Sequence, residues 1–139
     1  MFYTDVNSVV GRMDELRERV KESNIIGIVE KWATENISDA ELKIDGTNMF
    51  RLNKKSGVGG GILLYKDEVL NSNLCSSIMN SGFEELVWCT IDMTNKDRIL
   101  VGLCYRSPAS KGNNNDKLLQ LLDNMSSHRK FTHIINGRL

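Results

Sequence analysis

Glu30 is the strongest single candidate for chemistry in this sequence, because it follows directly on the apolar run 25–29. A continuous β-branched run of this kind is typical of a strand that is buried on both faces. A carboxylate at the end of such a strand is positioned by a rigid element and can bind a hard cation such as Mg²⁺. The ordinary alternative is a glutamate that faces solvent at a strand end, since glutamate side chains are mostly exposed.

A phenol and a guanidinium, Tyr105 and Arg106, stand at the end of a second apolar run, 101–104. A guanidinium binds phosphate oxygens through paired hydrogen bonds, and a neighbouring tyrosine can reach a scissile group. A tyrosine at the rim of the core beside a surface arginine explains the same two residues equally well.

Three other features favour structural roles. The glycine cluster 57–61 lacks the Lys-Ser/Thr ending of a phosphate-binding loop and precedes a strand, so it indicates backbone freedom in a hairpin. His128 and His133 have no partner at ligand spacing, which argues against metal binding by histidine. Trp32 and Trp88 are expected to pack in the core.

Hydrophobic periodicity predicts the elements that must position these residues. A helix is expected after Ser8, which stands in the N-cap position, and a second helix is expected at 116–125. Strands are predicted at 1–6, 25–29, 49–52, 60–65, 86–92, 99–105 and 131–135. The apolar face of the first helix would consist of Val9, Val10, Met13, Leu16 and Val20.

The order of these elements indicates an α/β fold. A strand, an amphipathic helix and a second buried strand open the chain, and catalytic groups in such sheets tend to lie at strand ends. The strands 49–52 and 60–65 are expected to form a hairpin, and the strands 86–92 and 99–105 are expected to pair antiparallel around the turn 95–97.

Composition limits the classes of function. The 139 residues are 40% hydrophobic and 26% charged, which is typical of one soluble globular domain spanning 1–139. Lys plus Arg and Asp plus Glu number 18 each, so no global positive field would hold the protein on nucleic acid. Cys75, Cys89 and Cys104 show no metal-binding spacing and favour reduced thiols. No signal peptide or membrane-spanning run is visible, so an intracellular location, in the cytoplasm or nucleus, is expected.

The motifs, taken in order, resemble the endonuclease/exonuclease/phosphatase family, and specifically the apurinic-endonuclease-like domains of non-LTR retrotransposons. The segment Tyr3-Thr4-Asp5-Val6-Asn7-Ser8, followed by Met13-Asp14-Glu15-Leu16, is similar to the opening of that family. Ile26-Gly27-Ile28-Val29-Glu30-Lys31-Trp32 resembles the family's I-I-G-I-x-E-x-W segment. Three further segments look like successive landmarks of the retroelement branch: 36–42, 59–65 and 101–108.

The resemblance implies the N-terminal half of a four-layer α/β sandwich of the DNase I-like type, a mixed sheet with flanking helices. It further implies Mg²⁺-dependent hydrolysis of a phosphodiester in DNA. Carried over by position, Glu30 would be the metal ligand and Tyr105 the site tyrosine. Asp5 stands where the family usually has Asn, which keeps an oxygen ligand but adds a charge and removes an amide donor.

The end of the chain departs from the family pattern. The segment leading to Gly137 is similar to the approach to the family's G-D-F-N motif, but Arg138 stands where the catalytic Asp is expected. A guanidinium about 4 Å from a divalent ion would repel it by several kcal/mol at an effective dielectric near 20. The Asp, the Asn after it and the distal Ser-Asp-His segment are absent, so activity is expected to be lost or much reduced.

The resemblance also leaves three interpretations open. The chain is a truncated nuclease remnant, a binding module for a protein or nucleic-acid partner, or an interrupted form of a complete endonuclease. If the chain lacks the second sheet of the family, one sheet face would be bare, which predicts poor solubility or a protein partner that covers that face.

Overall fold

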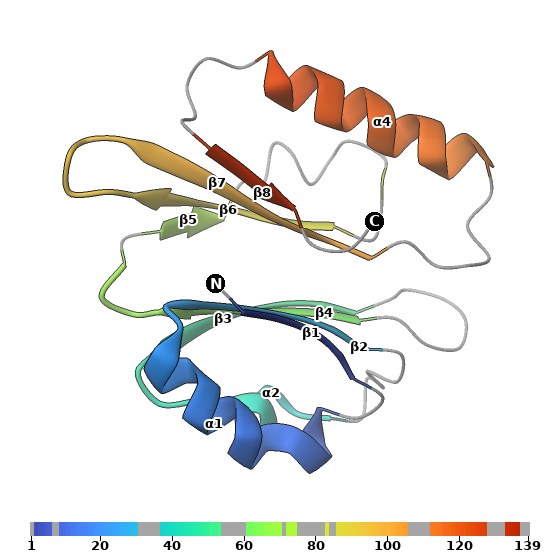
Figure 1. Ribbon diagram of the computed structural model, residues 1–139. Helices are drawn as coiled ribbons and strands as arrows, with labels where there is room; N and C mark the ends of the chain where they lie inside the picture. Colours follow the sequence, from blue (N-terminus) through green and yellow to red (C-terminus); the bar gives the residue numbers. More distant parts are fainter. Residues whose placement is uncertain are drawn as a thin grey trace. The chain divides into compact units, whose positions relative to one another are not determined.

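The computed structural model describes residues 2–6, 9–30, 37–53, 61–70, 72–74, 83, 86–105, 112–127 and 133–136. The chain divides into two compact units, Met1–Val69 and Leu70–Leu139. Each unit contains its own four-stranded sheet (Figure 1).

The first unit opens with two parallel strands joined by a helix. Strand β1, Phe2–Val6, pairs in parallel with β2, Ile25–Glu30. Between them lie the 3₁₀ turn η1, Val10–Arg12, and the helix α1, Met13–Glu22. This arrangement confirms the strand–helix–strand opening that the sequence predicts.

Helix α1 is amphipathic, as its residue spacing predicts. Met13 and Leu16 are buried, whereas Asp14 and Glu15 in the first turn and basic residues in the last turn suit the helix dipole. Val10, predicted on the apolar face, is 43% exposed because it belongs to η1, where the 3₁₀ turn changes the side-chain direction. The predicted N-cap Ser8 lies outside the described residues, and η1 follows Val9, which makes no side-chain cap.

The rest of the first unit completes its sheet. A short helix α2, Asp39–Leu42, precedes β3, Thr47–Asn53, and β4, Gly61–Asp67. Strand β4 pairs antiparallel with both β3 and β2, which gives the order β1-β2-β4-β3. The predicted hairpin is therefore confirmed, with β4 as an inner strand.

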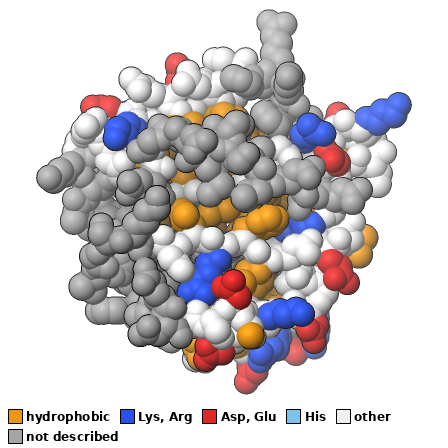
Figure 2. Space-filling model, turned by 180° about the vertical axis from the view of Figure 1, so that it is seen from behind, with side chains coloured by type: hydrophobic (Ala, Val, Ile, Leu, Met, Phe, Trp, Pro, Cys, Tyr) orange, Lys and Arg blue, Asp and Glu red, His pale blue; other side chains and the backbone are white. Residues whose placement is uncertain are grey.

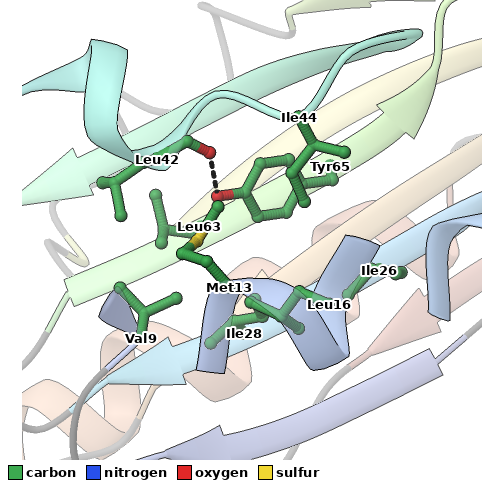
Figure 3. Packing of buried hydrophobic residues seen from close by; sticks show 9 residues of the cluster. All are labelled: Val9, Met13, Leu16, Ile26, Ile28, Leu42, Ile44, Leu63 and Tyr65. Carbon is green, nitrogen blue, oxygen red and sulfur yellow. Dashed lines mark hydrogen bonds between the residues drawn. The ribbon is translucent and has the colours of Figure 1, made fainter. Parts of the chain in front are cut away.

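One face of this sheet carries a core that α1 and α2 cover (Figures 1 and 3). Inside it the Tyr65 hydroxyl donates a hydrogen bond of 2.6 Å to the carbonyl oxygen of Leu42. This bond ties α2 to β4 and satisfies the phenol, which is 1% exposed. The buried members of the core are Val9, Met13, Leu16, Ile26, Ile28, Leu42, Ile44, Leu63 and Tyr65.

The second unit begins with three antiparallel strands. They are β5, Ser72–Leu74, β6, Leu86–Asp92, and β7, Arg98–Cys104. The helix α4, Gly112–Ser126, then leads to β8, His133–Asn136, which pairs in parallel with β7. The strand order is β5-β6-β7-β8, and α4 lies over one face of the sheet (Figure 1).

Trp88 occupies the centre of the core of this unit. It is fully buried, as predicted, and lies directly opposite Gly102 on β7. A Cβ atom added at Gly102 would overlap the Trp88 ring, so the indole needs a glycine at that position. The buried members of this core are Phe83, Leu86, Trp88, Leu100, Cys104, Leu118, Leu121 and Met125. Cys89 and Cys104 are buried, as predicted for these strands.

The presence of a second sheet corrects one prediction. The sequence suggested that the chain would lack a second sheet and leave one face bare, whereas strands β5 to β8 form such a sheet within the chain itself. The expectation of a bare sheet face was based on a missing second sheet, so it no longer follows. That a protein partner covers part of this chain stays a prediction. Among the described helices, none is long and apolar enough to cross a membrane.

Candidate functional site

The two acidic candidates of the first unit lie on neighbouring parallel strands. Glu30 is the last residue of β2, and Asp5 is the penultimate residue of β1. The register pairs Asp5 with Val29 and Val6 with Glu30. Strands in a sheet lie about 4.8 Å apart and rise about 3.3 Å per residue, so the Cα atoms of Asp5 and Glu30 are roughly 6 Å apart. The structure thus brings both positions to the same carboxyl end of a parallel pair.

The fit of a divalent cation to this place rests on donor chemistry. Asp5 and Glu30 both offer carboxylate oxygens, which are the donors that Mg²⁺ and Ca²⁺ prefer, and parallel strand ends fix their backbones. Among the side chains that the structure describes, no three His, Cys, Asp or Glu groups gather into a metal-binding cluster. The residue types of Asp5 and Glu30 fit a hard cation, and their backbones lie at the carboxyl ends of neighbouring strands.

A row of backbone positions continues from Glu30 across the sheet. Glu30 pairs with Gly61 on β4, and Gly61 pairs with Asn53 on β3. Gly61 has no side chain, so the middle of this row exposes no bulk between the two polar residues. Asn53 therefore belongs to the same end of the sheet as Glu30, two strands away.

Asn53 is held by Arg51, two residues earlier on the same strand. The Arg51 Nε–H donates to the Asn53 Oδ1 atom at 2.7 Å. One terminal nitrogen of Arg51 donates to the Ile37 carbonyl oxygen at 2.7 Å and to the Asp39 carboxylate at 2.8 Å. The Arg51 side chain is 12% exposed, so these bonds fix it in a largely desolvated place. Arg51 consequently joins β3 to the far end of the connection that leaves β2 at Glu30.

The helix α2 begins at Asp39, the residue whose carboxylate binds Arg51. Ser38 caps it, because the Ser38 hydroxyl accepts from the Glu41 backbone N–H at 3.4 Å. The Glu41 carboxylate in return accepts from the Ser38 backbone N–H at 2.8 Å and from its hydroxyl at 2.9 Å. The backbone N–H first, and the hydroxyl second, lower the pKa of Glu41 below its ordinary value.

Tyr105 belongs to the second unit and follows β7 directly, where it is half-buried. It stands at the carboxyl end of the other parallel pair, since β7 and β8 run parallel with Gly102 opposite Asn136. The neighbouring candidates Arg106 and Arg138 lie outside the described residues. Each unit thus carries sequence-predicted candidates at the carboxyl end of its own parallel pair, Asp5 and Glu30 in the first and Tyr105 in the second.

The sequence reasoning missed Arg51 and Asn53. Arg51 contacts Ile37 and Asp39, which are 14 and 12 residues away in the sequence, and no local residue spacing predicts such contacts. The Ser38-Asp39-Ala40-Glu41 segment does carry a local signal, because Ser followed three residues later by Glu is the pattern of a capping box. That pattern could have located the start of α2.

Comparisons with known proteins establish the fold. No family model and no curated protein matches the sequence. Among solved structures, the chain is similar to the human Nocturnin catalytic domain, solved with a bound sulfate anion, with a TM-score of 0.59 and 16% sequence identity. The match covers 91% of this chain and 55% of that chain, so this chain spans about half the length of that domain. The fold is therefore DNase I-like, which confirms the predicted fold class.

Proposed function

We propose that this chain is a retrotransposon-derived nuclease domain of the endonuclease/exonuclease/phosphatase type, acting on DNA phosphodiesters through Mg²⁺, with its hydrolytic step lost or much reduced. The observation that supports the proposal is the parallel pairing of β1 and β2, which brings Asp5 and Glu30 to the carboxyl ends of two neighbouring strands, one register position apart. The DNase I-like fold and the ordered sequence motifs support it.

Each site residue has a stated role in this proposal. Glu30 and Asp5 would supply carboxylate oxygens to a cation, and the role that the resemblance gives Tyr105 is to donate its hydroxyl to a phosphate oxygen of a substrate. The cation, when bound, polarises the phosphoryl oxygen and makes water a better nucleophile. Arg138 replaces the carboxylate that would accept a proton from the attacking water, and a guanidinium has no such capacity. Arg138 would therefore weaken the reaction in two ways, by repelling the cation and by leaving the attacking water without a proton acceptor.

Binding of DNA by this chain would depend on individual contacts. The net charge is zero. On the face drawn in Figure 2, basic and acidic side chains of the described residues are interspersed. Such a surface produces no strong long-range field, so affinity for phosphate comes from specific donors near the site. We place this function inside the cell, in the cytoplasm or nucleus, where buried thiols such as Cys89 stay reduced.

The experiment that tests the metal site is thermal melting with increasing Mg²⁺. A ligand that binds the native state alone raises the melting temperature, so Mg²⁺ should raise it in the wild type and Glu30→Gln should abolish the rise. Glu68→Gln is the matched control, since Glu68 is an exposed glutamate just beyond the end of β4. An equal rise in wild type and Glu30→Gln would remove Glu30 from the site and with it the proposed function.

The experiment that tests the lost step is nicking of supercoiled plasmid DNA. The wild type should show little or no Mg²⁺-dependent nicking, and Arg138→Asp should increase it by restoring a carboxylate. Adding Glu30→Gln to Arg138→Asp should return nicking to background. Strong nicking by the wild type would contradict the proposed loss, whereas oligonucleotide binding without any Mg²⁺ effect would favour a binding module.

A further inference from the structure

Asn53 is a polar residue at the candidate site that neither the sequence motifs nor the proposed function uses. It ends β3 at the row that runs from Glu30 through Gly61. Two strand spacings separate Glu30 from Asn53, which corresponds to about 10 Å between their Cα atoms. Gly61, in the middle of the row, is buried and has no side chain, whereas Asn53 at the far end is half-buried and carries a side-chain amide.

The Arg51 contact decides which end of that amide is available. Asn53 Oδ1 accepts the Arg51 Nε–H at 2.7 Å, so the oxygen faces the guanidinium. The amide nitrogen, with its two N–H donors, must then face away from Arg51. Arg51 is itself held by hydrogen bonds to Ile37 and Asp39, and its side chain is only 12% exposed. These contacts therefore hold the Asn53 amide in one orientation.

We propose that Asn53 is a substrate-contacting residue that donates its amide N–H groups to a phosphate of a nucleic-acid strand, and that Arg51 is the positioning residue that turns the amide outward. The inference rests on the proposed function, because it places this phosphate next to the cation site proposed at Glu30. An uncharged donor suits a chain of zero net charge, since it binds an anion at short range without a positive field.

The test is Asn53→Asp, which separates the contact from a structural role. An aspartate keeps an oxygen that accepts from Arg51, and the added charge strengthens that bond, so the fold should hold. The outward amide donors are replaced by a carboxylate oxygen that repels phosphate. A residue with a purely structural role would tolerate this change, whereas a phosphate donor would not.

The measurement is fluorescence anisotropy of a short labelled single-stranded DNA oligonucleotide, without metal, at low ionic strength. We expect Asn53→Asp to raise the dissociation constant about tenfold or more, with the melting temperature unchanged. Asn48→Asp is the matched control: Asn48 is exposed on the same strand, and five residues place it about 17 Å from Asn53. It adds the same charge and should leave binding unchanged.

The positioning role of Arg51 has its own readout. Arg51→Lys keeps the charge but loses the planar group that reaches three acceptors. When Asn53 is unchanged, this substitution should therefore weaken binding of the oligonucleotide. Because Arg51 acts through Asn53, adding Arg51→Lys to Asn53→Asp should weaken binding no further. Additive losses would show that Arg51 contacts the phosphate itself and would overturn its assignment as a positioning residue.

Failure of this inference can be told apart from failure of the proposed function. Equal weakening by Asn53→Asp and Asn48→Asp, or no measurable binding by the wild type, would overturn the role of Asn53. The Mg²⁺-dependent melting shift and its loss in Glu30→Gln would then still support the metal site. If instead the shift is unaffected by Glu30→Gln, the proposed function fails, and the role of Asn53 beside it fails with it.

Discussion

The two units of the chain have similar strand arrangements but differ in the interactions that hold their elements in place. Each contains a four-stranded sheet with one parallel pair whose strands are connected through a helix, β1-α1-β2 in the first unit and β7-α4-β8 in the second. The first unit positions its elements through directional polar contacts, among them the buried Tyr65 hydrogen bond and the part-buried Arg51 hydrogen bond to Ile37. The second positions its core by shape, with the Trp88 ring lying over Gly102.

This difference predicts how each unit responds to substitution. Hydrogen bonds contribute about 1 kcal/mol each and can be removed one at a time. A close-packed ring cannot be weakened in such small steps, because even one added methyl group must displace the ring or the backbone. Trp88 also gains nothing from polar contacts within the described residues, since its buried Nε1–H has no acceptor there. Substitutions should therefore be more damaging at the packed position than at any single hydrogen bond.

The largest expected effect is that of Gly102→Ala. The new Cβ would overlap the Trp88 ring, and both residues lie on paired inner strands, β6 and β7, that leave little room for movement. We expect a loss of about 3 kcal/mol in the free energy of unfolding, measured by urea denaturation. Gly11→Ala is the control, because a Cβ at Gly11 meets no atom within 4 Å.

A double-mutant cycle with Trp88→Leu would show whether the ring is the cause. Leucine replaces the indole with a shorter side chain and so removes the six-membered ring that a Cβ at Gly102 would overlap, so Gly102→Ala should cost much less stability in the Trp88→Leu background. An equal cost in both backgrounds would mean that the backbone of β7, and not the indole, requires glycine. The claim that shape governs this unit would then be wrong.

The next largest effect is expected for Tyr65→Phe in the first unit. The substitution keeps the ring in the core but leaves the Leu42 carbonyl oxygen without its 2.6 Å donor. We expect the free energy of unfolding to fall by about 2 kcal/mol, because the loss combines a hydrogen bond with the desolvation of a buried acceptor. Hydrogen exchange should show the loss first in α2 and β3. A drop as large as that of Gly102→Ala would erase the contrast between the units.

The sequence predicts the fold well where periodicity is strong. Strands β2, β4, β6 and β7 are continuous apolar runs, and each was predicted within about two residues of its observed bounds. Strand β5, Ser72–Leu74, was missed because three residues carry no period and their conformation is set by pairing with β6. Helix α4 starts at Gly112, ahead of the predicted start at 116, since glycine and three asparagines indicate a loop by propensity.

The site was predictable only in part, for a physical reason. Glu30 stands out because a carboxylate after a buried run is a local pattern, and the structure does place it at a strand end. The placement of Asp5 and Glu30 at neighbouring strand ends depends on the parallel pairing of β1 and β2, which the expected strand–helix–strand order predicts. Asn53 and Arg51 could not be found in this way, because their importance comes from the pairing of β3 with β4 and from contacts to Ile37.

A smaller effect is expected for Ser38→Ala at the start of α2. The alanine removes the hydroxyl that accepts from the Glu41 backbone N–H, so one donor of the first turn loses its partner. We expect a loss of about 1 kcal/mol in thermal or urea unfolding, which is the usual cost of removing a serine cap. Ser38→Asn, which retains a capping oxygen, should recover most of that stability. If Ser38→Asn is as unstable as the alanine variant, the cap contributes little.

The smallest effect is the pH dependence that comes from Glu41. Its pKa is lowered in the folded state, chiefly by the Ser38 backbone N–H, so the folded protein holds fewer protons there than the unfolded chain. The stabilisation is therefore present above the unfolded-state pKa and is lost as the pH falls through the folded-state pKa. Glu41→Gln should lower the melting temperature slightly at neutral pH and match the wild type in acid. In the Ser38→Ala background the difference should shrink but persist, because the backbone N–H remains. If the melting temperatures of wild type and Glu41→Gln differ by the same amount at both pH values, the effect comes from side-chain packing, and the charge of Glu41 does not contribute to the cap.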